Sequence, residues 1–514
     1  MRYRLAVIPM RLRYCALRLL LVLIVTASTF AGSAATTLLR GPYLQMGTPT
    51  NIVIRWRTDT TNAGRVQFGT NSSALAEFAD EVSAATNHSV LLSDLSPDTI
   101  YFYTVGTTNQ VLVGGTNFFF RTAPPAGSHR AFRAWVLGDF GFTNESAIPV
   151  RNAYYNFASN HYTDLFLMLG DNAYHTGHDG VWQMAVFNTY SNVLRQTPVW
   201  STIGNQETGN STTAEPTVYL QNFSFPTNAQ AGGLASGTEK YYSFDFGNVH
   251  FVCLDSMSSA RTSGSAMLLW LEADLQQTTN EWLIAFWHHP PYSKGSNDSD
   301  VRQEQIQMRT NAVRMLEAYG VDLVLGGHSH SYERSYLIDG HYGLSSSYST
   351  NTMLKDGGNG QVDGTGAYTK DALGLEGRQG AVYAVAGSGA QVGTGSFNHP
   401  VMYRSLNALG SMVLDIHANR LEAKFLRETG TIDDHFTIIK GMRPLRIIET
   451  TFAAGTATIT WGSVADRTYR VEFTPTLPPT AWSNASGLIR AADVTTSWTG
   501  AASTGFYRIW SAED

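Results

Sequence analysis

Polar side chains that bind metals follow several apolar runs of the chain, at the points where those runs stop. The run "VDLVLGGHSHSYER" ends with two imidazoles one residue apart. Four other runs, "AWVLGD", "DLFLMLGDNAY", "PVWSTIGNQE" and "EWLIAFWHHPPY", end in the same way. The polar residues at the five run ends are Asp139, Asp171, Tyr174, Asn205, Gln206, His288, His289, His328 and His330. Mixed oxygen and nitrogen donors suit first-row transition metals better than Ca²⁺ or a thiolate zinc site.

Each of these motifs is weak alone, since Gly-Asp is a common turn and a lone histidine is more often structural than ligating. Their repetition at five run ends is what predicts one site, because ligands bind at the carboxyl ends of strands in open α/β sheets. A glycine precedes Asp139, Asp171, Asn205 and His328. We expect it to allow a sharp exit from the strand and a close approach of the backbone.

The region that carries these motifs, residues 130–440, alternates short apolar runs with helical stretches, which predicts an α/β core. Helices are expected over 265–279 and 303–319. Their apolar faces are Leu268, Leu271 and Leu275 in the first, and Ile306, Val313 and Leu316 in the second. The Gly-, Ser- and Asn-rich interval 343–378 is expected to be a long surface loop.

All-β segments flank this core. In residues 36–124, "LSPDTIYFYTV" is similar to the Leu-x-Pro-x-Thr-x-Tyr pattern of fibronectin type III domains, in which a tyrosine anchors a corner of the sandwich. Residues 445–514 show short alternating strands again, and "TATITW" echoes the earlier "NIVIRW", so a second, small β-sandwich is expected. Substrate positioning, attachment and export all remain open as the role of this last module.

The first 35 residues have the features of a secretory signal peptide. Four arginines without an acid precede the apolar run "ALRLLLVLIV", and small residues follow up to Ala34 and Ala35. A retained membrane anchor is the alternative, but Arg18 interrupts the run and the apolar stretch is short for a span. No later segment is long enough to cross a membrane. We therefore expect a secreted, periplasmic or cell-surface protein.

Charge and cysteine content restrict the partners. Removing the first 35 residues leaves 30 basic against 41 acidic side chains, a formal net charge of −11. On this ground we do not expect nucleic acid to bind through a basic surface. Cys253 would then have no intramolecular partner, and we interpret it as a small buried apolar residue. The sequence gives no oligomeric state.

The ordered series GD, GDxxY, GNxE, a histidine after an apolar run, and GHxHxYER resembles the metallophosphoesterase domain of purple acid phosphatases. The resemblance covers about residues 38–440. The leading fibronectin-like segment is similar to that of the larger, plant-type members. The fold implied is an α/β metallophosphoesterase core with an N-terminal fibronectin-like β-sandwich, followed here by the small C-terminal all-β module.

The resemblance also implies a ligand set for two metals. Asp139, Tyr174 and His330 would bind a ferric ion, and Asn205, His288 and His328 a divalent ion, Zn²⁺, Mn²⁺ or Fe²⁺. Asp171 would bridge the two. The chemistry agrees with this division, because hard Fe(III) prefers phenolate and carboxylate ligands, while neutral amide and imidazole suit the divalent ions.

Two further residues are expected on the substrate side. His289 is a candidate for binding phosphate or protonating the leaving group. Gln206 stands where the family has a histidine that contacts phosphate, which puts the acid step and the substrate preference in question. His175 and His178 are more consistent with a solvated loop than with the site, and Glu333 and Arg334 with structural roles.

The implied activity is hydrolysis of small phosphate monoesters by a metal-bound hydroxide, that is, an acid phosphatase. A phosphodiesterase or nucleotide pyrophosphatase on the same scaffold is the nearest alternative. An alternative of another class is a non-catalytic surface binding protein with a relic metal site, against which the intact set of seven ligands argues.

Overall fold

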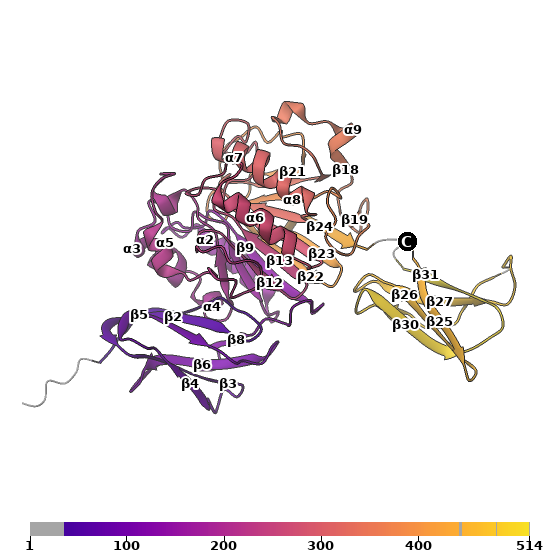
Figure 1. Ribbon diagram of the computed structural model, residues 1–514, viewed down its shortest axis with the longest axis horizontal. Coiled ribbons are helices and arrows are strands. Elements are labelled where there is room, and N and C mark those ends of the chain that lie inside the picture. Colours follow the sequence, from indigo (N-terminus) through magenta and orange to yellow (C-terminus); the bar gives the residue numbers. More distant parts are fainter. Residues whose placement is uncertain (1–34, 442–444, 480, 513–514) are drawn as a thin grey trace, which may run out of the picture.

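The computed structural model describes residues 35–441, 445–479 and 481–512, and folds them into two β-modules beside a larger central domain (Figure 1). The signal peptide expected from the sequence lies, but for its last residue, outside the described residues. Within the described ranges, no helix has the length and apolar character needed to cross a membrane.

The N-terminal module is built from two facing sheets. One consists of β1 (Leu38–Gln45), β2 (Ile52–Asn62) and β5 (Ala85–Leu92), and the other of β3 (Gly64–Gly69), β4 (Glu77–Asp80), β6 (Ile100–Thr107), β7 (Val111–Val113) and β8 (Phe119–Arg121). Trp56 and Tyr103 lie buried between them. The hydroxyl of Tyr101 accepts a hydrogen bond from the Ser96 amide at 2.9 Å, which is the tyrosine corner that the sequence predicts.

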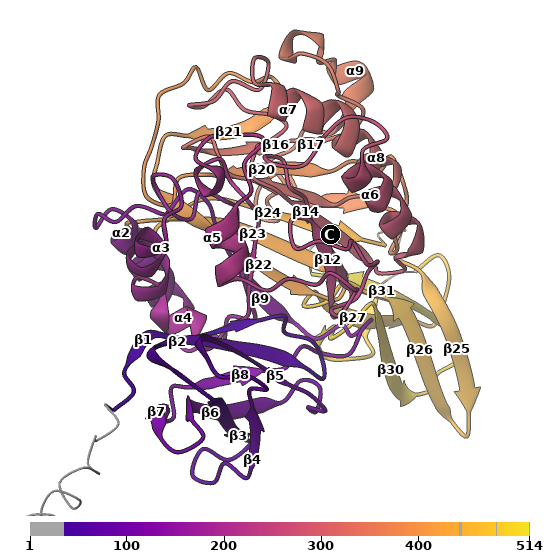
Figure 2. The ribbon, with the colours of Figure 1, turned by 60° about the vertical axis from the view of Figure 1, so that its left-hand side comes forward.

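Two seven-stranded sheets form the central domain (Figure 2). The first runs β11 (Val199–Ser201), β10 (Leu165–Met168), β9 (Phe132–Leu137), β22 (Gly410–His417), β23 (Arg420–Arg427), β24 (Ile432–Lys440) and β19 (Tyr368–Lys370). The second runs β12 (Tyr242–Phe246), β13 (Val249–Cys253), β14 (Trp282–Phe286), β15 (Leu323–Gly326), β20 (Val382–Ala386), β16 (Tyr332–Ser335) and β21 (Met402–Leu406).

Two residues on opposite faces of β9 show how the layers pack. Phe132 points to the other sheet, where its ring lies 4.7 Å from that of Phe246. Trp135 points outward and stacks on Tyr154 of helix α2 (Ala147–Ala158), with ring centroids 4.1 Å apart. Shorter helical segments follow: α3 (Asp179–Trp182), η1 (Gln183–Asn188), α4 (Ser191–Leu194), η2 (Gln206–Thr208) and α5 (Thr217–Asn222). The α/β fold class expected from the sequence is confirmed.

Both predicted helices are present and cover the outer face of the second sheet. The first is α6 (Ala266–Gln277), and its three predicted leucines are buried. The second consists of α7 (Gln303–Gln307), the π-helical η3 (Met308–Val313) and α8 (Arg314–Ala318). Val313 and Leu316 reach the core as predicted, whereas Ile306 is only half-buried and Met308 is fully buried. The wider π-turn shifts the register of side chains, which a regular helical period does not anticipate.

The interval predicted as a surface loop, 343–378, is more ordered than expected. It holds η4 (Ser345–Ser347), α9 (Thr350–Met353) and β18 (Leu354–Asp356), which pairs with β17 (Leu337–Ile338), and strand β19 extends the first sheet. Lys370 explains the capture of β19, because its buried ammonium lies 2.6 Å from Asp322. An ion pair between residues far apart in the sequence leaves no pattern in the sequence around either of them.

The C-terminal module forms two small sheets. One consists of β25 (Ile447–Ala453), β26 (Thr456–Gly462) and β30 (Thr495–Ala501), and the other of β27 (Thr468–Thr474), β28 (Ser483–Asn484), β29 (Ile489–Arg490) and β31 (Phe506–Ser511). Trp461 of "TATITW" is buried, as Trp56 of "NIVIRW" is. The Tyr469 hydroxyl accepts a hydrogen bond from the Val464 amide at 2.9 Å, five residues upstream, the spacing of the N-terminal corner. The expected second β-sandwich is therefore present.

Strand direction decides where the predicted site lies. In the first sheet β9, β10 and β11 are parallel neighbours, and in the second β14 and β15 are. All five strands lead into the polar motifs at their carboxyl ends, so the motifs meet at one edge of the two-sheet core.

Candidate metal centre

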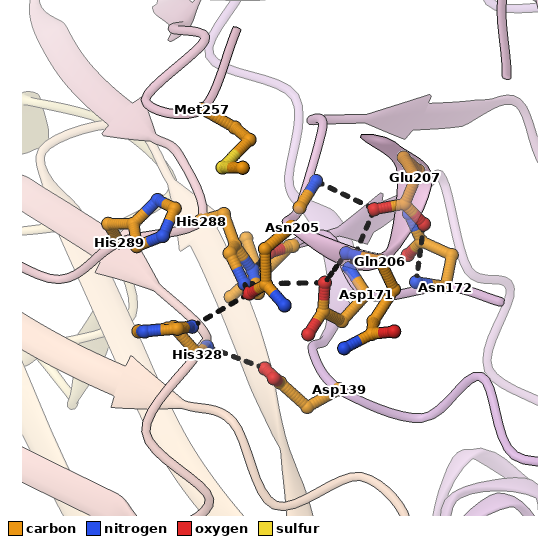
Figure 3. Close-up of polar contacts among 12 residues, drawn as sticks. Asp139, Asp171, Asn172, Asn205, Gln206, Glu207, Met257, His288, His289 and His328 are labelled. Atoms are coloured by element: carbon orange, nitrogen blue, oxygen red, sulfur yellow. Dashed lines mark hydrogen bonds and ion pairs between the residues drawn. The ribbon is translucent and has the colours of Figure 1, made fainter. Parts of the chain in front are cut away.

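The five strand-end motifs converge on one place, where the loops of the two sheets are hydrogen-bonded to each other (Figure 3). The backbone amide of His328, after β15, donates to Oδ2 of Asp139, after β9, at 2.7 Å. Nδ1 of His288, after β14, lies 2.8 Å from the carbonyl oxygen of Leu169, after β10. These bonds fix the two sheets' loops against each other at the site.

Three of the predicted ligands form a first group. The hydroxyl of Tyr174 donates to Oδ1 of Asp139 at 3.0 Å and lies 3.2 Å from Nε2 of His330. The same His330 nitrogen lies 3.4 Å from the Asp139 carboxylate. The Tyr174 ring stacks on Phe142 with centroids 4.0 Å apart, which holds its hydroxyl toward the other two side chains.

A second group gathers around the side-chain oxygen of Asn205. Nε2 of His288 and Nδ1 of His328 each lie 3.0 Å from this oxygen. Since Nδ1 of His288 is engaged by the Leu169 carbonyl, its Nε2 is the nitrogen that faces the group. The three donor atoms are thus directed at a common point.

Asp171 lies beside both groups. Its Oδ1 accepts a hydrogen bond from the Gln206 amide at 2.8 Å and lies 3.5 Å from Nε2 of His288. Burial raises the pKa of Asp171, the nearby charge of His288 opposes this rise, and the charge of Asp139 adds to it. Figure 3 shows Asp171 pointing into the space that Asp139, Asn205 and His288 also face.

The backbone at the site is unusual for non-glycine residues. Asp139, Asp171 and His328 have φ values of 55°, 52° and 64°, in the left-handed region. Such conformations are rare outside glycine and gather at functional sites. Gly204 meets the expectation of close backbone approach, because a Cβ there would lie 2.2 Å from the Asp171 nitrogen and 2.4 Å from its Oδ1.

Glu207 holds these loops together. The sequence alone assigned no role to this residue. Its carboxylate accepts hydrogen bonds from the backbone amides of Asp171 at 3.0 Å, Asn172 at 2.8 Å and Gly204 at 2.7 Å. Burial, together with the neighbouring charge of Asp171, raises the pKa of Glu207 to about 7. The glutamate of the GNxE motif is the signal that could have identified it, since a buried carboxylate beside a tight turn needs amide donors.

The electrostatics of the centre call for a cation. Among the described residues, Asp139 and Asp171 form no ion pair with a lysine or arginine, although both are buried. Burial and the charges of Asp139 and Asp171 raise the pKa of Tyr174 well above its ordinary value. Burial and the neighbouring His288 and His330 hold the pKa of His328 well below its usual range, so its lone pair is available.

The donor set fits metal ions on this evidence. Side-chain ligand atoms of Asp139, Asp171 and His288 all lie within 4.8 Å of one another, as do those of His288, His289 and His328. Buried carboxylates without a lysine or arginine partner, beside imidazole nitrogens, are an arrangement that a divalent or trivalent ion stabilises. The oxygen-rich first group and the nitrogen-rich second group differ in the metals that they favour.

The two residues expected on the substrate side border the same space. Oε1 of Gln206 accepts a hydrogen bond from the Thr176 amide at 3.3 Å, which leaves its amide N–H groups as donors. The ring of His289 lies 4.4 Å from that of His328, and its Nδ1 lies 2.9 Å from the Ser256 hydroxyl. His175 and His178 are exposed on their loop.

The contacts of Glu333 and Arg334 agree with the structural roles expected for them. The Glu333 carboxylate accepts from the hydroxyls of Ser293 and Ser331 and from backbone amides of the 293–295 loop. Arg334 makes a two-pronged ion pair with Asp434 at 2.7 and 2.9 Å. Both residues hold loops in place.

Cys253 is fully buried, which agrees with its interpretation as an apolar residue.

Comparisons with known proteins match both parts of this architecture. Residues 132–332 match the family described as Calcineurin-like phosphoesterase, and residues 40–122 match the one described as Purple acid Phosphatase, N-terminal domain. The chain belongs to the purple acid phosphatase family. The family resemblance seen in the sequence motifs is thereby confirmed.

Named relatives agree with the assignment. Purple acid phosphatase 15 of Arabidopsis thaliana is 29% identical over 301 residues, which are 53% of this chain and 53% of that protein. Human acid phosphatase type 7 is 28% identical over 63% of this chain and 76% of its own length. The purple acid phosphatase from yellow lupin seeds shares the fold, with a TM-score of 0.62 at 17% identity over 79% of this chain and 75% of that one. The match thus spans about half of the Arabidopsis relative.

The role of Glu207 is open to test. Glu207→Gln replaces one acceptor oxygen by an NH₂ group that faces a buried amide N–H, so we expect a loss of stability of about 1–3 kcal/mol. Denaturant unfolding measures this loss. Glu272→Gln, on the exposed face of α6, is the matched control and should change stability by less than about 0.5 kcal/mol. Equal effects of the two substitutions would show that Glu207 does not hold the turns.

Proposed function

We propose that this protein is an acid phosphatase that hydrolyses small phosphate monoesters at a binuclear metal site. The observation that carries the proposal is the division of six predicted ligands into two contacting groups, with the seventh, Asp171, beside both. Family membership supports it. We further propose the domain limits 36–124, 130–440 and 445–514 for the three modules and 1–35 for the signal peptide.

The proposed metals follow from the chemistry of the two groups. Asp139, Tyr174 and His330 supply a carboxylate, a phenolate and an imidazole, a set that favours Fe(III). Asn205, His288 and His328 supply only neutral donors, which suit Zn²⁺, Mn²⁺ or Fe²⁺. Asp171 contributes the anion that two neighbouring cations need between them. Such a pair of ions supplies an acidified water as nucleophile and positive charge for the phosphoryl oxygens.

The chain's own residues position the ester. Gln206 presents amide donors to a phosphoryl oxygen, since its own oxygen is held by Thr176. His289 is fixed through Ser256 on the side of the second group, where it is placed to bind phosphate or to meet the leaving group. The buried loops around both residues limit access of bulk water.

The proposed setting is outside the cytoplasm: secreted, periplasmic or on the cell surface. It rests on the composition of residues 1–35. The proposed partner is a small phosphorylated molecule. The acidic net charge speaks against nucleic acid as a partner.

Comparing an aryl phosphate monoester with the corresponding diester tests the activity. We expect faster turnover of p-nitrophenyl phosphate than of bis(p-nitrophenyl) phosphate. A preference for the diester would favour the phosphodiesterase alternative.

The Asp171→Asn variant tests the proposed bridge between the two metals. We expect it to lose nearly all turnover together with at least one metal ion. Normal metal content and rate in Asp171→Asn would refute the bridge, and absence of iron, zinc and hydrolysis after reconstitution would favour the binding protein.

Colour tests the iron ligand. A phenolate bound to Fe(III) absorbs visible light by charge transfer, so the iron-loaded protein should be purple or pink and Tyr174→Phe should bleach it. The substitution keeps the ring that stacks on Phe142, which limits its effect on packing. Iron quantification beside the visible spectrum separates loss of the band from loss of the metal. An iron-replete protein with no visible band would remove Tyr174 from the coordination sphere.

Gln206 should shape the substrate preference. A glutamine donates a hydrogen bond but delivers no proton near neutral pH, and a general acid contributes on the order of 10²–10⁴-fold, mostly with poor leaving groups. We therefore expect Gln206→His to raise turnover of alkyl phosphates more than that of p-nitrophenyl phosphate. Rates on both substrates across the acid and neutral pH range measure the difference. Equal changes would place proton delivery elsewhere.

A further inference from the structure

The C-terminal module is attached to the central domain through polar groups. It has its own apolar core, formed by Ile459, Trp461, Tyr469, Val471 and Ala491. Across the interface, the Asn419 side chain donates to the Ser463 carbonyl at 3.1 Å and accepts from the Ala465 amide at 3.1 Å. Domain motion is the expectation where an interface is not large and hydrophobic.

His129 lies between two carboxylates at this interface. Its Nε2 is 2.9 Å from Glu281 of the central domain, and its Nδ1 is hydrogen-bonded to Asp493 of the C-terminal module. An imidazole bridges two carboxylates by donating from both nitrogens only when it is protonated. Glu281 is also bound by the Asn248 side chain at 2.7 Å and lies within range of the Lys440 charge.

His417 makes a second, simpler contact across the interface, with one carboxylate. Its Nδ1 is 2.8 Å from Oδ2 of Asp466 in the C-terminal module, and the other oxygen of Asp466 accepts from Arg490 at 2.8 Å. Both histidines are between one fifth and one quarter exposed, so water and protons reach them. Two imidazole–carboxylate pairs therefore join the module to the central domain.

We propose that His129 is a pH-dependent latch, which docks the C-terminal module while its ring bridges Glu281 and Asp493 as a double donor and releases the module when one of these donors is lost. With a protonated ring, both hydrogen bonds of His129 join opposite charges. Deprotonation removes the second donor of His129 and the positive charge of its ring. The inference concerns the module's attachment and does not depend on the proposed phosphatase activity.

The direction of the effect follows from the charges. Burial alone would lower the pKa of His129, but the hydrogen bond to Asp493 and the charge of Glu281 outweigh it and raise the pKa above 6.5. Docking that depends on a raised histidine pKa is complete below pH 6.5 and is lost as pH rises through the raised value. His417 and Arg490 lower the pKa of Asp466 below 3.8, despite its partial burial, so that carboxylate stays charged in mild acid.

The latch lies far from the metal centre along the strands. His129 precedes β9, whose other end leads to Asp139, and His417 ends β22, which runs antiparallel beside β9. Both histidines are therefore at the sheet edge opposite the predicted ligands. Release would free the module as a tethered arm without opening or covering the metal centre.

Amide hydrogen exchange at Ala465 reports the latch in the full-length protein, because that amide donates across the interface. We expect its protection factor, corrected for intrinsic exchange, to fall on the order of tenfold or more between pH 5.5 and 8. In a His129→Asn, His417→Asn double variant the protection should be low at both pH values. Phosphatase activity of the variant should match that of the unmodified protein.

His435→Asn is the matched control, since His435 pairs with Asp363 at 3.2 Å within the central domain. It should leave the pH dependence at Ala465 unchanged. Constant protection of Ala465 from acid to neutral pH in the unmodified protein would overturn the proposal. So would a double variant that keeps full protection, or one that keeps the pH dependence. A thermal melt of each variant confirms that the central domain remains folded.

Discussion

Two buried carboxylates within reach of each other are the constraint around which the central domain is built. Asp139 and Asp171 lie out of water with only amide, phenol and imidazole partners among the described residues. Such a pair repels itself strongly in a medium of low polarity. The fold tolerates it because every neighbouring element supplies donors, and because the space between the carboxylates is suited to cations. Strain at three left-handed residues is a further cost that the surrounding sheets must offset.

The two-sheet core makes that concentration of polar groups possible. Parallel strands in both sheets deliver their loops to one edge, and bonds between the sheets lock the loops together. Glu207 ties three amides of the first sheet's loops to one carboxylate, so the turn that presents Asp171 and the turn that presents Asn205 are bound to the same side chain. Positions of ligand atoms are then set by rigid strands and not by the loops alone.

Local sequence patterns predict much of this arrangement, and their limits are physical. Strand ends, both helices on the second sheet and the corner tyrosine Tyr101 each leave a local signal in residue type or spacing, and the structure has them. Pairing of β9 with β22 joins residues far apart in sequence, and nothing in either strand encodes its partner. The π-turn at Met308–Val313 and the capture of β19 by Lys370 and Asp322 depend on tertiary packing. The carboxylate of Glu207 was visible in its motif, but its three amide partners were not.

Histidines at the opposite edge of the same sheets have a different environment. At the predicted metal edge, burial and the neighbouring His288 and His330 lower the pKa of His328, which favours the neutral imidazole that can act as a ligand. At the edge that holds the C-terminal module, partial exposure and paired carboxylates favour the protonated imidazole, as for His129. One side chain type thus performs two tasks in one domain, with burial and neighbouring charge selecting between them. The length of β9 separates the two tasks, because His129 precedes this strand and the predicted ligand Asp139 follows its other end.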